Sequence, residues 1–401
     1  MNQVTQPARH RRFLRHSLAA ALLCSTLGAT ASFAAQEPLK IGFIGTLSGP
    51  GGALGQDQYD AFMLALEQKG GKLGGVPVEV IREDDQLKPD VGVQAATKLL
   101  KSEKVSIITG VTFSNVMMAI HKPITDAEVF LIGSNAGPAP IAGKSCSPYF
   151  FSTSWDNDQL HEAGGQLASD LGYKNMYVMA ANYQAGRDAV SGFKRDYTGK
   201  IIDEVYTQVN QPDYSAEIAQ LQAASPDAVY VFYPGGMGIN FVKQYRQAGL
   251  LGKVPLISVS TIDGTTLPAL KSLAVGAITS APYAPNIDNP QNKQFVEAFV
   301  KAYKRPPSMY AAQSYDAANL LDSALGKVKG DIGNKEAFRS ALKAADFASV
   351  RGAFKLDTNQ IADGAFYRVD VVEGANGAEL KAVSPITIKT RANFAAQCSM
   401  K

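Results

Sequence analysis

The feature that most restricts the fold of this chain is a regular alternation of short β-branched apolar runs with longer amphipathic stretches, which starts at Leu39. This alternation is typical of strand–helix–strand units, whose strands form parallel sheets covered by helices. It therefore predicts an α/β fold. With 401 residues, 46% of them apolar, the chain is long enough to build two hydrophobic cores.

The predicted strands and helices fall into two groups with the same order of elements. The first group has strands at Lys40–Ile44, Val76–Ile81, Val105–Thr109 and Val129–Ile132 and helices at Gln56–Lys69, Asp90–Ser102 and Ser114–Asp126. The second has strands at Met176–Met179, Ile201–Val205, Ala228–Phe232 and Val254–Ser258 and helices at Asn157–Leu171, Gly186–Tyr197, Asp213–Ala224 and Met237–Ala248. The groups share an architecture but no matching residues, and they predict two similar lobes.

The chain after Ala277 has too little predicted strand to form a third domain. It holds predicted helices at Asn292–Lys304, Ala311–Val328 and Lys335–Ala345 and a strand-like stretch at Gly364–Val372. We expect it to complete both lobes by crossing between them, which creates a hinge and a ligand cleft. The expected division is 35–155 and 283–364 for lobe 1, 156–282 and 365–390 for lobe 2, and a C-terminal tail, 391–401, that returns to lobe 1.

The N-terminal segment is typical of a secretory signal peptide. Basic residues end at Arg15, an apolar run covers 18–27, and small residues follow up to Ala35. The run is too short to span a bilayer comfortably, so we expect residues 1–34 to be a cleaved signal peptide. Without this segment, 35 basic residues stand against 36 acidic ones. A general basic surface is therefore excluded, and no nucleic-acid partner is expected.

Export also changes how the cysteines are interpreted. Cys24 falls in the predicted signal peptide, which leaves Cys146 and Cys398 in an oxidising compartment. Two cysteines allow a single pairing, so we predict a Cys146–Cys398 disulfide. The alternative is two separate buried thiols.

Motifs of common enzyme classes are absent. The sequence has no P-loop, GxSxG or HExxH motif, and neither His121 nor His161 has a cysteine or carboxylate at metal-ligand spacing. The run Gly49–Gly55 loosely resembles a dinucleotide fingerprint, but it stands several residues beyond its strand, and an exported protein has no ready nicotinamide pool. The sequence predicts no enzymatic activity, cofactor or metal.

Small polar residues follow several predicted strands. The candidates are, in chain order, Thr46, Ser48, Ser114, Asn115, Asn135, Ala136 and Gly137. Open parallel sheets bind ligands at the carboxyl ends of their strands, so we expect these residues to face the cleft. Ser114 begins a predicted helix, where its hydroxyl and the free N–H groups can hold a carboxylate. The simpler alternative is that Ser114 only caps the helix.

Four of these segments carry a resemblance to the Leu/Ile/Val-binding family, the extracytoplasmic solute receptors of ABC importers. The segments are Leu39–Pro50, Gly110–Ser114, Phe151–Ser154 with the nearby Asp156 and Gln159, and Phe354–Asp357 followed by Asn359. They occur in the family's order and extend over nearly all of the mature chain. The resemblance implies two Rossmann-like lobes of the type I periplasmic binding protein fold, joined by three crossings.

The resemblance also implies which residues meet the ligand. In this family a serine at the position of Ser114, and backbone near Ala136 and Gly137, hold the ligand carboxylate, while an acid on the second lobe takes the amino group. The matching stretch here, Leu256–Thr261, contains Ser260 and no acid. An α-ammonium left without an anion in a closed cleft is poorly compensated. Asp263 is the alternative partner for an amine.

Aromatic residues surround the same predicted region. The family's second-lobe tyrosines are replaced by Ala185 and Gly236, which leaves room for a ring. Trp155, Tyr183 and Tyr283 are the aromatic candidates for stacking on a ligand. Two further tyrosines, Tyr233 and Tyr310, are expected to serve in packing. This pattern resembles family members that take benzoate-like or cinnamate-like acids.

The favoured hypothesis is a periplasmic, monomeric receptor that binds a small carboxylate, preferably an aromatic acid, and delivers it to an ABC permease. A branched-chain or other amino acid is the alternative ligand. A second class is a sensing subunit that passes lobe closure to a signalling partner. An exported enzyme is the third class, but the sequence shows no catalytic constellation for it.

Overall fold

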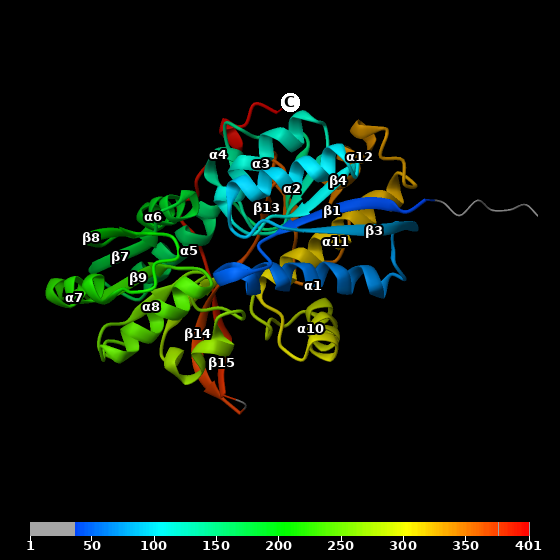
Figure 1. Ribbon diagram of the computed structural model, residues 1–401. Coiled ribbons are helices and arrows are strands. Elements are labelled where there is room, and N and C mark those ends of the chain that lie inside the picture. The colour runs from blue at the N-terminus through cyan, green and yellow to red at the C-terminus, as the bar shows by residue number, and fades with distance from the viewer. Residues whose placement is uncertain (1–36, 376, 401) are drawn as a thin grey trace, which may run out of the picture. The chain divides into compact units, whose positions relative to one another are not determined.

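The structure is a computed structural model that describes residues 37–375 and 377–400. The predicted signal peptide, 1–34, and Cys24 lie outside the described residues. The described chain forms two large sheets, of six and seven strands, each covered by helices, and one two-stranded sheet. The large sheets are the centres of two α/β lobes, which confirms the predicted fold class (Figure 1). None of the helices in this part of the chain is both long and apolar enough to cross a membrane.

The first sheet contains the strands from the N-terminal part of the chain. Its order is β2-β3-β1-β4-β5-β6, and all neighbours are parallel except β2 and β3. The strands are β1 Leu39–Gly45, β2 Lys72–Leu73, β3 Val76–Asp84, β4 Ile107–Gly110, β5 Phe130–Gly133 and β6 Phe150–Ser152. The helices between them are η1 Gly49–Gly51, α1 Gly52–Gln68, α2 Pro89–Lys101, α3 Ser114–Asp126 and α4 Ala139–Ala142. The predicted strands therefore lie in one sheet, in neighbouring positions.

The second sheet is mixed. Its order is β15-β14-β11-β10-β9-β7-β8, and the strands from β11 to β8 are parallel. The strands are β7 Asn175–Ala181, β8 Lys200–Thr207, β9 Ala228–Phe232, β10 Leu256–Ser258, β11 Ile278–Ala281, β14 Phe366–Gly374 and β15 Gly377–Ile386. The helices are α5 Asn157–Asp170, α6 Gln184–Asp196, α7 Ser215–Ala224, α8 Gly236–Gln247, α9 Leu267–Leu270 and η2 Lys271–Ala274.

The C-terminal part contains more strand than its sequence predicts. β14 and β15 form a long antiparallel hairpin that adds to β11 at the edge of the second sheet. The expectation of little strand was wrong because no described residue of β15 is fully buried, so this strand has no continuous apolar run. A short pair, β12 Lys355–Leu356 and β13 Ala362–Asp363, precedes the hairpin.

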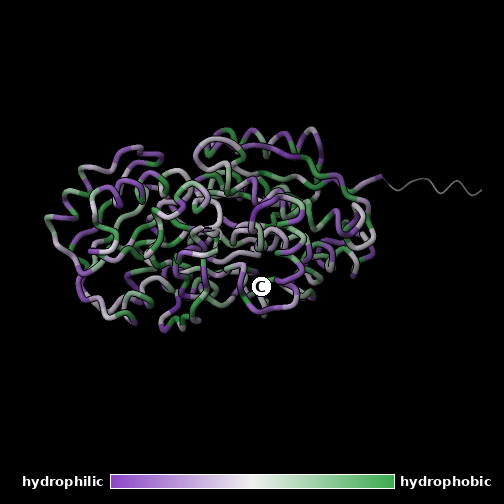
Figure 2. Tube along the Cα trace, turned by 90° about the horizontal axis from the view of Figure 1, so that it is seen from below, coloured by the Kyte–Doolittle hydropathy of each residue, from purple (hydrophilic) through white to green (hydrophobic). Residues whose placement is uncertain are grey.

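Three long helices return to the first lobe. They are α10 Pro290–Tyr303, α11 Met309–Lys327 and α12 Lys335–Ala344. α11 packs along α1, and its apolar face joins Phe62, Ile107 and Phe338 in one buried cluster (Figure 1). The chain thus leaves the first lobe after β6, returns after β11, and enters the second lobe again at β14. Figure 2 shows hydrophobic segments inside the lobes and hydrophilic segments on the outer turns.

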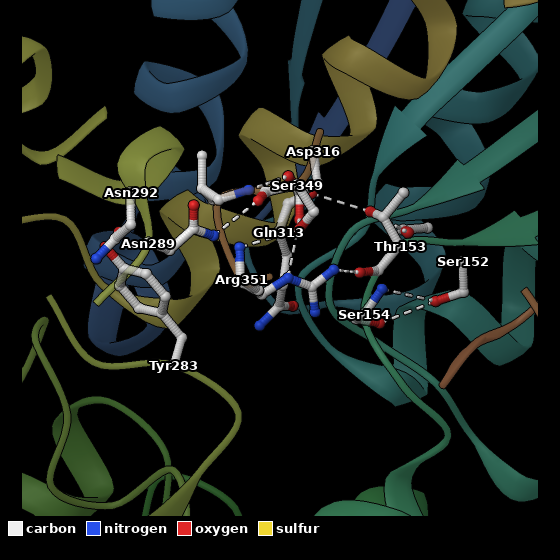
Figure 3. Close-up of polar contacts among 12 residues, drawn as sticks. Ser152, Thr153, Ser154, Tyr283, Asn289, Asn292, Gln313, Asp316, Ser349 and Arg351 are labelled. Carbon is white, nitrogen blue, oxygen red and sulfur yellow. Dashed lines mark hydrogen bonds and ion pairs between the residues drawn. The ribbon is translucent and has the colours of Figure 1, made fainter. Parts of the chain in front are cut away.

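A polar network joins the segments that pass between the lobes. Arg351 donates from Nε to Asp316 on α11, at 2.9 Å, and from its Nη2 to the backbone carbonyl of Thr153. Asp316 also accepts hydrogen bonds from the hydroxyl of Ser349 and the N–H of Val350. Figure 3 shows the Arg351 guanidinium extended between Asp316 and Thr153. Arg351 therefore joins α11, through a buried ion pair with Asp316, to the segment after β6, through a hydrogen bond to Thr153.

Candidate ligand-binding site

A buried cavity lies where the carboxyl ends of strands from the two sheets face each other. Residues from both lobes and from the start of α11 line it: Leu54, Thr112, Phe113, Ser114, Asn135, Ala136, Trp155, Asn157, Leu160, His161, Tyr183, Ala185, Phe232, Pro234, Ser260 and Tyr310. Parallel α/β sheets bind ligands at this edge. Six of the predicted site residues therefore come together here: Ser114, Asn135, Ala136, Trp155, Tyr183 and Ser260.

Ser114 is the first residue of helix α3 and not its cap. The capping position belongs to Phe113, whose side chain makes no capping bond. The Ser114 hydroxyl accepts a hydrogen bond from Asn157 Nδ2 at 3.1 Å, so its own proton is available to a ligand. The N–H groups of the first helical turn lack acceptors inside a helix and carry its positive dipole end. This corner of the cavity suits an anion.

Two strained turns shape the cavity, one in each lobe. Val111 follows β4 with φ 62°, and Ser260 follows β10 with φ 52°. A left-handed conformation is rare for residues other than glycine, and especially for a β-branched one such as Val111. Strain of this kind persists where the surrounding structure holds it, often at binding sites. Both turns direct the chain from a strand end into the cleft.

Aromatic rings form most of the walls. Tyr183 and Phe232 are stacked, with ring centroids 6.1 Å apart and an angle of 16° between the planes. Phe113 approaches Tyr183 from the first lobe at 6.4 Å. Trp155 and Tyr310 complete the apolar surface, and both are almost fully buried. The site offers flat apolar faces with a few polar atoms between them.

No carboxylate is among the residues that line this cavity. Asp263 faces away, because its Oδ1 accepts hydrogen bonds from the N–H groups of Thr265 and Thr266 and from the Thr265 hydroxyl. Its Oδ2 accepts a hydrogen bond from Tyr310 Oη at 2.9 Å, so Tyr310 stands between Asp263 and the cavity. Burial raises the pKa of Asp263. In this arrangement Asp263 stabilises its own turn and the tyrosine.

The histidine in the cavity wall carries no positive charge that could pair with a ligand carboxylate. His161 lines the cavity, and its Nδ1 pairs with Tyr230 Oη. Burial lowers the pKa of His161 to about 3, so the ring is neutral at physiological pH. Within the described residues no group of histidine, cysteine or acidic side chains is placed to hold a metal ion. The cavity is therefore polar at points but uncharged.

The other predicted site residues lie elsewhere. Thr46 is buried against Asp85, Ser48 is exposed beside Asp84, and Asn115 donates to the Leu87 carbonyl. Tyr283 donates to Asn292, next to a separate small cavity. Gly137 packs against the backbone of Trp155. Thr46, Ser48 and Tyr283 therefore have partners away from the cavity, whereas Gly137 lies just behind its wall, against Trp155 and Asn157.

Backbone near Ala136 and Gly137 is also occupied. The Ala136 N–H donates to the Val111 carbonyl at 3.1 Å, and the Gly137 N–H donates to Asn157 Oδ1 at 3.3 Å. The expectation that these groups hold a carboxylate therefore requires them to exchange partners. Ser114 and the start of α3 need no such exchange.

Direct contacts across the cleft show that the lobes are closed on each other. Asn157 of α5 reaches Ser114 of α3, and the Ala139 N–H donates to Asp188 of α6 at 3.2 Å. Gly236, predicted to meet the ligand, instead meets Pro50, since a Cβ on this glycine would lie 2.9 Å from the proline Cβ. Pro50 of the first lobe thus packs closely against Gly235 and Gly236 of the second lobe at the edge of the cleft.

Several lining residues were not predicted. No pattern in the sequence identifies these residues as binding residues: Leu54, Asn157, Leu160, Phe232 and Pro234. Tyr310 was expected to serve in packing. All of these residues converge from helices and turns far apart in the chain. Phe232 and Pro234 stand at the end of β9, so the rule that strand ends face ligands was the signal that could have found them.

Two α/β lobes closed over an uncharged, ring-lined cavity define a solute receptor that works by enclosing a small molecule. The chain belongs to the periplasmic binding protein family, whose model matches residues 38–377. A relative from Brucella melitensis, "Leu/Ile/Val-binding protein homolog 6", is 28% identical over 84% of this chain and 87% of its own length. The family's ABC-transporter receptors bind small molecules outside the cytoplasm, deliver them to membrane permeases and are not enzymes, as predicted.

Solved structures include relatives with aromatic ligands. The solute-binding protein of an ABC transporter from R. palustris, solved in complex with benzoate, is 31% identical over 90% of this chain and all of that chain, with a TM-score of 0.84. A solute-binding protein from Rhodopseudomonas palustris BisB5, solved with 3,4-dihydroxy benzoic acid, is 27% identical over 88% of this chain and 98% of that chain, with a TM-score of 0.81.

Proposed function

We propose that this receptor captures a small aromatic carboxylate and releases it to an ABC permease. The observation that carries the proposal is the cavity itself, which has aromatic walls, a helix start with a free hydroxyl proton at Ser114, and no carboxylate in its lining. The benzoate complex of the R. palustris relative supports the same ligand class. The relatives named for branched-chain amino acids make leucine the competing ligand.

The ligand carboxylate meets the start of α3. The Ser114 hydroxyl donates one hydrogen bond, and the first N–H groups of the helix add others along the positive end of its dipole. Asn157 holds the Ser114 oxygen from the opposite lobe, so it orients the hydroxyl proton only when the lobes are closed. The contact between Asn157 and Ser114 therefore couples recognition of the anion to closure of the lobes.

The ligand ring lies among Trp155, Tyr183 and Phe232. The closed cavity is narrow, with a volume of about 30 Å³, enough for about two water molecules. A ring therefore enters while the lobes are apart, and the aromatic side chains adjust around it. A micromolar Kd corresponds to about −8 kcal/mol, within reach of one anchored carboxylate and one buried ring.

An α-ammonium has no comparable partner in this arrangement. The nearest candidate, Asp263, is held by four hydrogen bonds and separated from the cavity by Tyr310. Binding leucine would require this carboxylate to leave its partners or the amine to remain uncompensated, which costs several kcal/mol in a site without water. The geometry therefore favours acids that lack an amine.

The proposal also covers export, oligomeric state, the boundaries of the lobes and the signal given to the partner. Residues 1–34 direct export and are removed, and the mature protein works in the periplasm as a monomer. Lobe 1 comprises 35–155 and 283–364 and lobe 2 comprises 156–282 and 365–390, with the tail 391–401 returning to lobe 1. Lobe closure on the ligand is the signal that the permease, or a signalling partner, recognises.

The primary test is a titration of mature protein that has been stripped of carried-over ligand by unfolding and refolding. Benzoate and leucine are added separately, and heat and the fluorescence of Trp155, the single tryptophan, are followed. Micromolar benzoate binding with a change in emission, and no leucine binding, is the expected result. Tight leucine binding without benzoate binding would overturn the proposal.

Replacing Ser114 with alanine is expected to weaken benzoate binding about 10- to 100-fold, because a hydrogen bond to a charged group contributes about 1.5–3 kcal/mol. Calorimetric titration measures the loss. Ser280→Ala is the matched control, since its hydroxyl is buried in the second lobe, donates to the Leu160 carbonyl and does not line the cavity. Equal affinities in Ser114→Ala and the wild type would place the carboxylate elsewhere.

Benzoate binding is expected to involve no proton uptake by His161 between about pH 6 and pH 8. The pKa of His161 is lowered to about 3 by burial, so this ring takes up no proton when an anion binds in that range. Calorimetry in buffers of different ionisation enthalpy measures proton uptake directly. Proton uptake on binding that disappears in His161→Gln would show that His161 becomes the cation that meets the carboxylate.

A further inference from the structure

The last residues of the chain contact both lobes. After β15 the backbone passes over helices α5 and α6 of the second lobe. The N–H groups of Lys389 and Thr390 donate to Asp196 Oδ1 at 3.2 and 2.9 Å, and the N–H of Ala392 donates to Glu162 Oε1 at 2.7 Å. Both carboxylates are buried. This end of the tail is therefore fixed to the second lobe.

The next residues are fixed to the first lobe. Phe394 packs against the buried cluster that contains Ile141 and Phe150, and Cys398 forms a disulfide with Cys146, with 5.6 Å between the Cα atoms. The predicted disulfide is thus present in the structure. Figure 1 shows the red end of the chain rising from β15, past α5, to the region of α4. This disulfide therefore connects the two lobes covalently, in addition to the segments that cross between them.

We propose that residues 387–398 form a strap, anchored by the disulfide, that limits how far the two lobes open. The strap spans the same two elements that meet across the cleft, since the Ala139 N–H of α4 donates to Asp188 of α6, and Asp196 ends that same helix. Any motion that separates α4 from α6 must stretch the strap or detach one of its ends. The inference rests on lobe closure as the binding mechanism proposed above.

The length of the strap sets its limit. Six residue steps separate Ala392 from Cys398, a maximum of about 20 Å when fully extended. Part of this length is wound into the short helix η3, Ala395–Gln397, which shortens the link in the closed state. Wide opening therefore requires η3 to unwind or the bonds to Asp196 and Glu162 to break. A strap of this kind keeps the empty receptor closer to its closed form and favours ligand binding.

The test uses the fact that the two anchors act in series. The double variant Asp196→Ala with Glu162→Ala removes the side-chain acceptors that hold the strap to the second lobe, so the strap is free back to β15, and reduction of the disulfide in the wild type removes its covalent anchor to the first lobe. Each change alone is expected to increase the radius of gyration of the ligand-free protein, measured by small-angle X-ray scattering. Reduction of the double variant is expected to give the same radius as reduction of the wild type, because a strap without its covalent anchor no longer transmits tension.

Asp227→Ala is the matched control, since Asp227 also accepts two backbone N–H groups, those of Lys174 and Asn175, but only within the second lobe. This variant is expected to leave the radius of gyration unchanged. Circular dichroism verifies that each protein is folded, and if the double variant fails to fold, the reduced wild type still supplies the test. An unchanged radius after reduction, or a larger radius in the reduced double variant than in the reduced wild type, would overturn the proposal.

A benzoate titration of the same samples measures the consequence for binding. Detachment at either end is expected to weaken affinity about fivefold or more, the usual lower range for coupling between a conformational element and a site. If benzoate does not bind the wild type, the proposed ligand is wrong while the scattering result still decides the strap. If benzoate binds and detachment changes the radius but not the affinity, the strap does not act on ligand binding.

Discussion

Replacing Ser260 with aspartate is expected to weaken benzoate binding by about 100-fold or more and to bring leucine binding into the measurable range. The introduced carboxylate would lie in the cavity with the ligand carboxylate. Two like charges about 5 Å apart repel by about 3 kcal/mol at an effective dielectric constant of about 20. The same charge would compensate an α-ammonium. Calorimetric titration with both ligands measures the reversal.

Position 260 is suited to this substitution because of its backbone. Ser260 has φ 52°, and aspartate and asparagine are the residues other than glycine that tolerate this conformation best. Ser260→Asn is therefore the matched control, with nearly the same volume and no charge, and is expected to retain most of the benzoate affinity. Unchanged benzoate affinity in Ser260→Asp would mean that the ligand acid does not share the cavity with this residue.

Replacing Arg351 with methionine is expected to lower the free energy of unfolding by about 3–5 kcal/mol. Asp316 would then be a buried carboxylate without its cation, and removing one partner of a buried ion pair is costly for this reason. Burial already raises the pKa of Asp316, and the charge of Arg351 opposes that rise. Urea unfolding followed by circular dichroism measures the change.

Lys293→Met is the matched control for the loss of an ion pair. Lys293 pairs with Asp288 at 2.7 Å, but both side chains are largely exposed, so removing the pair is expected to change stability by less than about 1 kcal/mol. The double variant Arg351→Met with Asp316→Leu should regain part of the loss, because it removes the buried charge itself. A small effect of Arg351→Met alone would show that the hinge pair is not important for stability.

Much of the fold could be predicted because its parallel strands are buried and short. β9 and α3 have the predicted bounds, Ala228–Phe232 and Ser114–Asp126, and the other strands of the two predicted groups differ by a few residues at their ends. Buried strands of this type are continuous apolar runs, a local signal. The hairpin of β14 and β15 was underestimated because β15 is partly exposed along both faces and carries no such run.

The binding cavity was harder to predict because it is assembled from distant segments. Ser114 and Ser260 were identified by their positions after strands, and both line the cavity. Thr46 and Ser48 follow a strand in the same way but face Asp85 and Asp84. Tyr310 was assigned to packing because it is an aromatic residue near the predicted hinge. The strand-end rule locates the edge of a sheet, but it does not give the direction of a side chain.

Local periodicity and residue counts were enough to predict the α/β class, the two lobes, the absence of enzyme motifs and, with two separate thiols as the alternative, the pairing of Cys146 with Cys398. The packing of distant segments was needed to show that Asp263 faces its own turn and Tyr310 instead of the cavity, and that the C-terminal residues join both lobes. The orientation of a buried polar group is set by the partners that satisfy its hydrogen bonds, and those partners come from parts of the chain that only folding brings together.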